Sequence, residues 1–116
     1  MDEVARRRLL GLLGLGVRGR LALVGVDRVR EAAHRGTLRV AVVAADAAKN
    51  SRAKVDGLLA AKKVPTIEVP SASELGEVAG RESTAVIGVV DAQLAKGILA
   101  AARPADAAQE SSRRKG

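Results

Sequence analysis

The segment Leu38-Arg-Val-Ala-Val-Val-Ala44 is apolar at every position except Arg39 and is rich in valine. Its length and its β-branched residues predict a strand that is buried on both faces. Before it, the apolar spacing from Val26 to Arg35 predicts a helix, and Gly36 stands in the usual position beyond a helix C-terminus. A buried strand that directly follows an amphipathic helix indicates an α/β domain.

Helices and strands continue to alternate after this segment. A helix capped by Asn50 or Ser51 is expected to run to about Lys63, and a strand over 65–69 begins at a proline. The Ser-x-x-Glu spacing that starts at Ser71 is typical of a capping box, in which serine and glutamate each bond the other's backbone amide. It predicts the start of a further helix.

The two ends of the chain follow the same pattern. A leucine-rich N-terminal helix is expected to loosen at the glycines between 11 and 19, before a short strand over 21–24. Residues 84–90 predict the last strand, and Asp91 is expected to cap a final helix that Arg103-Pro104 ends.

Together these elements predict one α/β domain over residues 1–102. We expect a three-layer α/β/α sandwich, in which a four-stranded mixed sheet carries helices on both faces. Residues 103–116 are rich in Ala, Ser and charged side chains and are expected to form a disordered basic tail.

The composition excludes several classes of protein. The 116 residues include no Cys, Trp, Tyr or Phe and a single His. A disulfide scaffold, a thiolate zinc site, a cysteine nucleophile and a multi-histidine metal centre are therefore excluded, and no metal or cofactor is expected. Recognition of nucleic acid by stacking bases on aromatic rings is excluded as well.

The chain also lacks the sequence signals of membrane insertion or export. No apolar run approaches the roughly 20 residues needed to cross a bilayer, and the charged start does not resemble a signal peptide. We expect a cytoplasmic protein that has no membrane partner.

Positive charge is concentrated in the first half of the chain. The formal net charge is +7, and residues 1–63 contain 14 Lys or Arg against 6 Asp or Glu. So much positive charge on a small domain favours a polyanionic partner, and nucleic acid is the commonest one.

One short motif suggests a nucleotide-binding enzyme. Gly14-Leu-Gly-Val-Arg-Gly19 matches the G-x-G-x-x-G fingerprint of dinucleotide-binding proteins. However, it follows a helical pattern rather than a strand, and no acidic residue stands about 20 positions further on. His34 lies beside Arg35 near a helix end, where histidine commonly interacts with terminal carbonyls. We therefore favour a non-catalytic protein.

Basic residues are the better candidates for a functional surface. Arg28 and Arg35 are seven residues apart, which places them on one face of a helix. The loop from Gly80 to Thr84 adds an arginine, two hydroxyls and backbone amides, all of which are suitable donors to phosphate and sugar oxygens. The basic residues that crowd the second helix and the segment after it are Arg18, Arg20, Arg28, Arg30, Arg35, Lys49, Arg52 and Lys54.

The order of several short motifs resembles that of a known family over about residues 8–100. These motifs are Leu12-Leu-Gly-Leu15, Gly25, Arg35-Gly36, Val42-Val-Ala-Ala-Asp46, Val64-Pro65, Val69-Pro-Ser71 and Glu74-Leu-Gly-Glu-Val-Ala-Gly80. Together they resemble the kink-turn RNA-binding family of ribosomal proteins, with the bacterial YlxQ-like members closest in style. The Glu-Leu-Gly segment after the Val-Pro-Ser turn is the most specific.

This resemblance implies a function and a site. Members of the family bind a kink-turn, a sharply bent RNA helix with tandem sheared G·A pairs, through the N-terminal turn of the second helix and the loop before the last strand. Carried onto this chain, with the nearby Arg20 added from the basic cluster, the RNA-binding residues are Arg20, Gly25, Val26, Asp27, Arg28, Glu31, Arg35, Arg81, Glu82, Ser83, Thr84 and Ala85.

The chain departs from the family pattern at three of these positions. Where the family has Gly-x-Asn-Glu-x-x-Lys, this sequence reads Gly25-Val-Asp-Arg-Val-Arg-Glu31. Asp27 accepts hydrogen bonds but does not donate them. Arg28 can contact guanine O6 and N7 or a phosphate. Glu31 would repel phosphate unless Arg28 or Arg35 neutralises it.

Our leading hypothesis is a monomeric, non-catalytic protein that binds structured RNA, either a kink-turn or ribosomal RNA, with the ribosome as one candidate assembly. The alternative is a protein-interaction or accessory domain of the same fold, which acts through a partner without specific kink-turn recognition. A third hypothesis, a nucleotide-binding enzyme, requires saturable binding of NAD or ATP that depends on Gly16.

Overall fold

The computed structural model describes residues 2–102, and within this range five helices alternate with four strands. The expected stop at Arg103-Pro104 and the expected tail over 103–116 lie outside the described residues. In chain order the elements are α1 (Glu3–Arg18), β1 (Ala22–Val24), α2 (Val26–Arg35), β2 (Val40–Ala44), α3 (Lys49–Ala61), β3 (Thr66–Val69), α4 (Ala72–Val78), β4 (Val86–Val89) and α5 (Ala92–Ala102).

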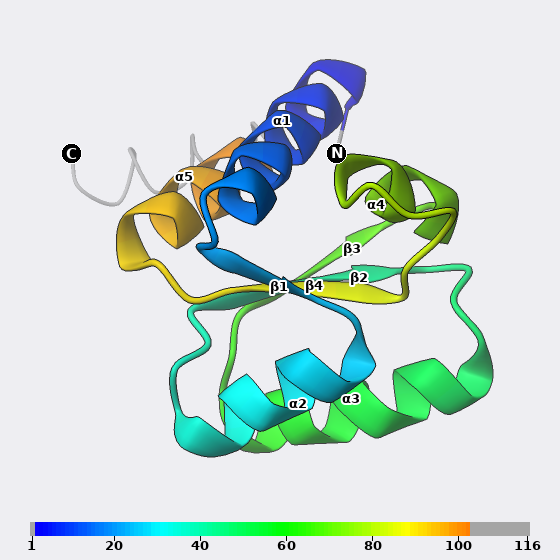
Figure 1. Ribbon diagram of the computed structural model, residues 1–116, viewed down its shortest axis with the longest axis vertical. Coiled ribbons are helices and arrows are strands. Elements are labelled where there is room, and N and C mark those ends of the chain that lie inside the picture. The colour runs from blue at the N-terminus through cyan, green and yellow to red at the C-terminus, as the bar shows by residue number, and fades with distance from the viewer. Residues whose placement is uncertain (1, 103–116) are drawn as a thin grey trace, which may run out of the picture.

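The sheet is mixed and has the strand order β1-β4-β2-β3. Strand β4 runs antiparallel to both β1 and β2, whereas β2 and β3 are parallel. Helices α1, α4 and α5 cover one face of the sheet, and α2 and α3 cover the other (Figure 1). The three-layer α/β/α sandwich expected from the sequence is therefore confirmed.

Strand β2 lies at the centre of the molecule, and all five of its residues are buried. Val40, Val42 and Ala44 belong to the core under α1, α4 and α5, while Ala41 and Val43 belong to the core under α2 and α3. Both cores consist of Ala, Val, Leu and Ile. This alternation is what a strand covered on both faces requires.

Helix α1 differs from the expectation. It continues without a break through Gly11, Gly14 and Gly16 and ends at Arg18, with Gly19 as its C-cap. A Cβ built on Gly16 would lie 2.6 Å from Leu94 Cδ2 of α5, so this glycine allows the two helices to approach closely. The close packing outweighs the cost of about 1 kcal/mol that glycine imposes inside a helix. Since the G-x-G-x-x-G motif lies within a helix rather than between a strand and a helix, it does not form a phosphate-binding loop.

Three of the expected helix caps can be compared with the structure. Asp91 accepts a hydrogen bond from Leu94 N at 2.8 Å, and Ser71 accepts bonds from the amides of the first turn of α4. The prediction that Glu74 in turn bonds the backbone amide of Ser71 was wrong, because the Glu74 carboxylate pairs with Arg6 on α1 instead. The expected cap of α3 was also wrong: the helix starts at Lys49, after Ala48, with no side-chain cap. Among residues 2–102, no helix combines the length and the apolar character needed to cross a bilayer.

Candidate nucleic-acid interface

The junction between β1 and α2 is a single glycine. Gly25 has φ 100° and ψ 160°, a conformation that is essentially restricted to glycine. Its amide donates to the carbonyl of Val86 at 3.0 Å, which ties the junction to the start of β4. No side chain caps α2, so the amides of its first turn remain available to an external acceptor.

The loop between α4 and β4 is fixed by hydrogen bonds within the protein. The amide of Arg81 donates to the Gly76 carbonyl at 2.7 Å, and that of Thr84 donates to the Ala72 carbonyl at 3.0 Å. Thr84 is only 7% exposed, and its hydroxyl donates to the carbonyl of Val86 at 3.4 Å. The predicted site residue Thr84 therefore holds the loop in place rather than presenting its hydroxyl to a ligand.

The remaining loop residues divide between the surface and the sheet. Glu82 and Ser83 are exposed at the tip, and Ala85 is half-buried with its carbonyl accepting the amide of Ala44 at 2.9 Å. The tip can thus meet a ligand, while the end of the loop continues into β4.

The structure brings the junction and the loop together. A guanidinium nitrogen of Arg81 lies 3.9 Å from the position of a Cβ built on Gly25. The hollow between the two segments has a volume of about 510 Å³ and is lined by Val24, Gly25, Val26, Asp27, Arg28, Ser51, Lys54 and Arg81. Two residues of α3, Ser51 and Lys54, take part in it. Neither is among the RNA-binding residues predicted from the sequence, although Lys54 belongs to the basic cluster, because no local signal places α3 beside the start of α2.

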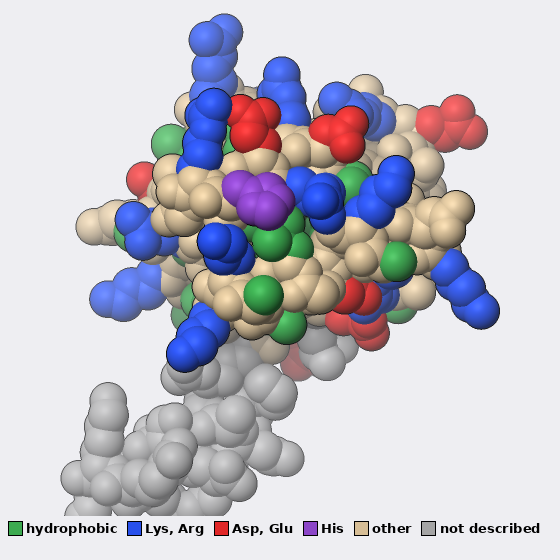
Figure 2. Space-filling model, turned by 90° about the horizontal axis from the view of Figure 1, so that it is seen from below, with side chains coloured by type: hydrophobic (Ala, Val, Ile, Leu, Met, Phe, Trp, Pro, Cys, Tyr) green, Lys and Arg blue, Asp and Glu red, His purple; other side chains and the backbone are tan. Residues whose placement is uncertain are grey.

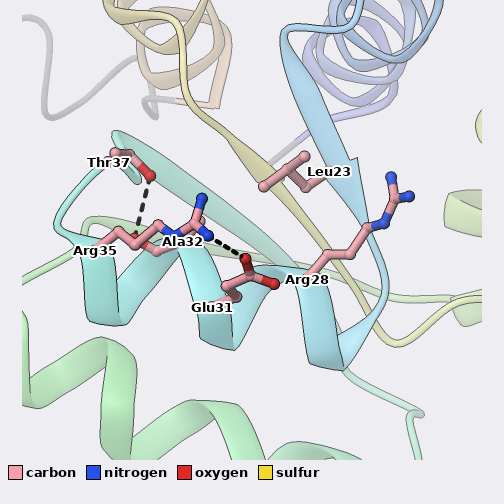
Figure 3. Close-up of a pocket in the computed structure, with 6 residues that line it drawn as sticks. All are labelled: Leu23, Arg28, Glu31, Ala32, Arg35 and Thr37. Carbon is pink, nitrogen blue, oxygen red and sulfur yellow. Dashed lines mark hydrogen bonds and ion pairs between the residues drawn. The ribbon is translucent and has the colours of Figure 1, made fainter.

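Arginines also surround the free edge of β1. A second hollow of about 480 Å³ is lined by Arg20, Arg28 and Arg81 together with apolar residues of α1 and β1 and with Ala79, the C-cap of α4. A third, of about 320 Å³, lies between Leu23 and α2, with Arg28 at one end and Arg35 at the other (Figure 3). Arg28 lines all three hollows. We call the first turn of α2, the loop 81–85 and Arg20 the candidate interface.

Glu31 is neutralised within its own helix. Its carboxylate accepts from the Arg35 guanidinium at 2.7 Å, and the two side chains are 61% and 70% exposed. Figure 3 shows the Arg28 side chain extending away from this pair. Within residues 2–102, no ion pair or side-chain hydrogen bond engages Arg20, Arg28 or Arg81. The sequence analysis expected Glu31 to need a neighbouring arginine to offset its charge, and Arg35 is that arginine. Arg28 forms no ion pair within residues 2–102, so its guanidinium can contact a ligand.

Two members of the basic cluster support the fold instead. Arg52 donates to the carbonyl of Ala44 at 3.2 Å and pairs with Asp56 and Glu68, each at 3.0 Å. Burial lowers the pKa of Arg52, but hydrogen bonds to Glu68 and Asp56 outweigh that effect and raise the pKa above its usual value. Arg30 donates to the backbone carbonyl of Lys54, which links α2 to α3. Neither arginine belongs to the candidate interface.

The charge of the two helical layers differs. The segment 25–64, which contains α2, β2 and α3, has nine Lys or Arg against four Asp or Glu. The other described residues, 2–24 and 65–102, have seven of each. Figure 2 shows Lys and Arg side chains spread across the α2 and α3 face. Within residues 2–102, no group of three or more His, Asp or Glu side chains is arranged to hold a metal ion.

The fold and this surface define a small, basic α/β/α domain with an uncapped helix N-terminus and, at one edge, arginines that form no ion pair with another of residues 2–102. The chain belongs to the ribosomal protein L7Ae/L30e/S12e/Gadd45 family, whose model matches residues 11–99. This confirms the resemblance seen in the sequence. A search of curated proteins found no significant match.

Two solved structures illustrate the similarity. A protein with unknown function from Bacillus halodurans is 29% identical to the chain, with a TM-score of 0.74, and the match covers 81% of this chain and 95% of that one. A 15.5kD RNA binding protein from Giardia lamblia is 20% identical, with a TM-score of 0.75, and 88% of each chain is covered. At this identity the second likeness establishes the fold alone.

Proposed function

We propose that the chain is a non-catalytic RNA-binding protein that holds structured RNA, a kink-turn or a ribosomal RNA segment, at the candidate interface. The observation that carries this proposal is the meeting of Arg81 with Gly25, which brings an arginine of the loop to the N-terminus of α2. Membership of a ribosomal protein family and the RNA binding of the Giardia lamblia protein of the same fold support it.

The chemistry of the interface suits a phosphate backbone. The first-turn amides of α2 provide donors and a partial positive charge, which together favour an anion. Helix α3 also starts without a side-chain cap, and its first turn contributes Ser51 to the same hollow. Arg28, Lys54 and Arg81 add three full charges around it. Phosphate oxygens are the ligand class that uses all of these donors at once.

The departures from the family pattern alter the way in which a base would be read. Arg28 stands where the family has a glutamate, and a guanidinium makes paired hydrogen bonds to guanine O6 and N7 in a groove. Asp27 accepts only, so it suits an amino group of a base or a hydroxyl of ribose. We therefore propose that Arg28 supplies the guanine contact in this protein.

The test is a calorimetric titration of the full chain with a kink-turn RNA, a regular duplex and ribosomal RNA, first at low salt and then at increasing salt. We expect binding of the kink-turn RNA that weakens as salt rises, because phosphate contacts release counterions. Absence of binding to all three RNAs would overturn the proposal. Copurification of one protein partner after nuclease treatment, with no RNA retained, would favour the accessory-domain alternative instead.

A further inference from the structure

A second group of basic residues lies at the opposite end of the α2 and α3 layer. Helices α2 and α3 both end on the side where β2 and β3 begin (Figure 1). His34 lies in the last turn of α2, Arg39 directly before β2, and Lys62 and Lys63 directly after α3. All four are exposed, and we call them the distal basic patch.

Backbone hydrogen bonds bring the segments of this patch together. The amide of Ala41 donates to the carbonyl of Pro65 at 2.9 Å, so the start of β2 lies beside the chain that follows Lys63. The amide of Arg39 donates to the carbonyl of Val89 at the end of β4, at 2.8 Å. Arg39 is therefore anchored to the sheet, and the segment that follows Lys63 is held beside it.

The backbone of Lys63 is the observation that points to a role for its side chain. Lys63 has φ 56°, in the left-handed region that glycine adopts at the lowest cost. Helix α2 ends in the ordinary way, with a glycine at φ 74°. Glycine would adopt this conformation after α3 at a lower energetic cost than lysine. The presence of a lysine at this position is explained if its positive charge contacts a ligand.

Two carboxylates on segments next to the patch, Asp91 after β4 and Glu31 on α2, already have hydrogen-bond or ion-pair partners within residues 2–102. The carboxylate of Asp91 is engaged by the amide of Leu94 at 2.8 Å, and Glu31 is engaged by Arg35. Lysine is a point charge without the planar fork that reads a base, so the fitting ligand is a phosphodiester backbone of any sequence.

We infer that the distal basic patch is a second contact for the RNA backbone, at the far end of α2 from the candidate interface. The inference rests on the proposed function and extends it. The ten residues of α2 separate the two contacts by about 15 Å, so one RNA can lie along the α2 and α3 face and touch both. The patch strengthens binding without contributing to sequence preference.

The test uses the full chain with Arg39→Gln, Lys62→Gln and Lys63→Gln combined. The matched control combines Arg7→Gln, Arg8→Gln and Lys96→Gln, which removes three exposed charges from α1 and α5 on the other layer. Against the same kink-turn RNA and a regular duplex, the triple variant should lose affinity for both. Its slope of log affinity against log salt should fall by roughly 2–3, while that of the control stays unchanged.

A second variant separates binding from folding. Lys63→Gly relieves the left-handed backbone and removes the charge, so thermal stability should stay level or rise while the salt slope falls by about 1. Slopes equal to the control in both variants, with Arg28→Ala still weakening RNA binding, would overturn this inference and leave the proposed function intact. If Arg28→Ala also had no effect, the proposed function itself would fail. Binding of acidic polypeptide but not RNA to the patch would likewise overturn the inference.

Discussion

Ser83 lies directly against Gly76. A Cβ built on Gly76 would come within 2.4 Å of the Ser83 Cα and 2.5 Å of its amide nitrogen, closer than any real side chain lies. The contact is between backbones, so no rotamer change can relieve it. Gly76 therefore determines how closely the loop that carries Arg81 packs against α4.

Replacing Gly76 by alanine should displace this loop. We expect Gly76→Ala to lower the free energy of unfolding by about 1–3 kcal/mol, as overpacked sites do, and to weaken RNA binding. Gly57→Ala is the control, because Gly57 is exposed on α3 with open space around it, and it should stabilise the protein by roughly 0.5–1 kcal/mol. Thermal denaturation and calorimetric titration measure both effects. A Gly76→Ala protein that melts and binds like the parent would show that the loop adapts freely.

Arg28 is the first residue to test in the interface, because it lines all three hollows and has no ion-pair partner within residues 2–102. Arg28→Ala should reduce RNA affinity and lower the salt slope by about 1, with stability unchanged within about 0.5 kcal/mol. Arg8→Ala, an exposed arginine of α1, serves as the control. Equal losses in the two variants would indicate general attraction rather than a defined contact.

Two substitutions at Arg20 should distinguish an effect on RNA binding from an effect on stability. The φ of Arg20 is 61°, so Arg20→Gly removes backbone strain together with the charge, whereas Arg20→Ala removes only the charge. We expect both variants to bind RNA more weakly and the glycine variant to be more stable than the alanine variant by about 1 kcal/mol. Parallel melting curves and gel shifts decide the matter. RNA affinity that follows stability, and not charge, would contradict this assignment.

Glu31 should restrain RNA binding. Its pair with Arg35 is exposed and contributes little to stability, about 0.3–0.5 kcal/mol for a helix pair of this spacing. Glu31→Gln should therefore leave the fold intact, free Arg35 and increase RNA affinity a few-fold. Glu77→Gln, on the opposite layer, controls for the change in net charge. If affinity were unchanged in Glu31→Gln but raised in the control, the interface would have to lie elsewhere.

Local signals predicted much of the fold. Helix α2 begins at Val26 and ends at Arg35 before Gly36, as its apolar spacing and terminal glycine indicated. The path of α1 through its glycines could not be predicted in the same way. It depends on Leu94, which lies 78 positions further along the chain and packs on Gly16.

The features of the candidate site also divide into those that local sequence predicts and those that depend on distant residues. The Glu31–Arg35 pair follows from i,i+4 spacing and needs no tertiary information. The inward-facing roles of Arg52 and Thr84 depend on Glu68 and Ala72, whose proximity arises only when the sheet forms. For the same reason the sequence placed Lys54 in the basic cluster but did not predict that it lines the same hollow as Arg28.

The purely aliphatic interior has a practical consequence. With no Phe, Tyr, Trp or Cys in the sequence, the protein absorbs almost no near-ultraviolet light and has no intrinsic fluorescence. In a titration with RNA, the near-ultraviolet absorbance and circular dichroism therefore come almost entirely from the RNA. The conformation of a bound RNA can thus be followed by near-ultraviolet spectroscopy during the titration, without a background from the protein.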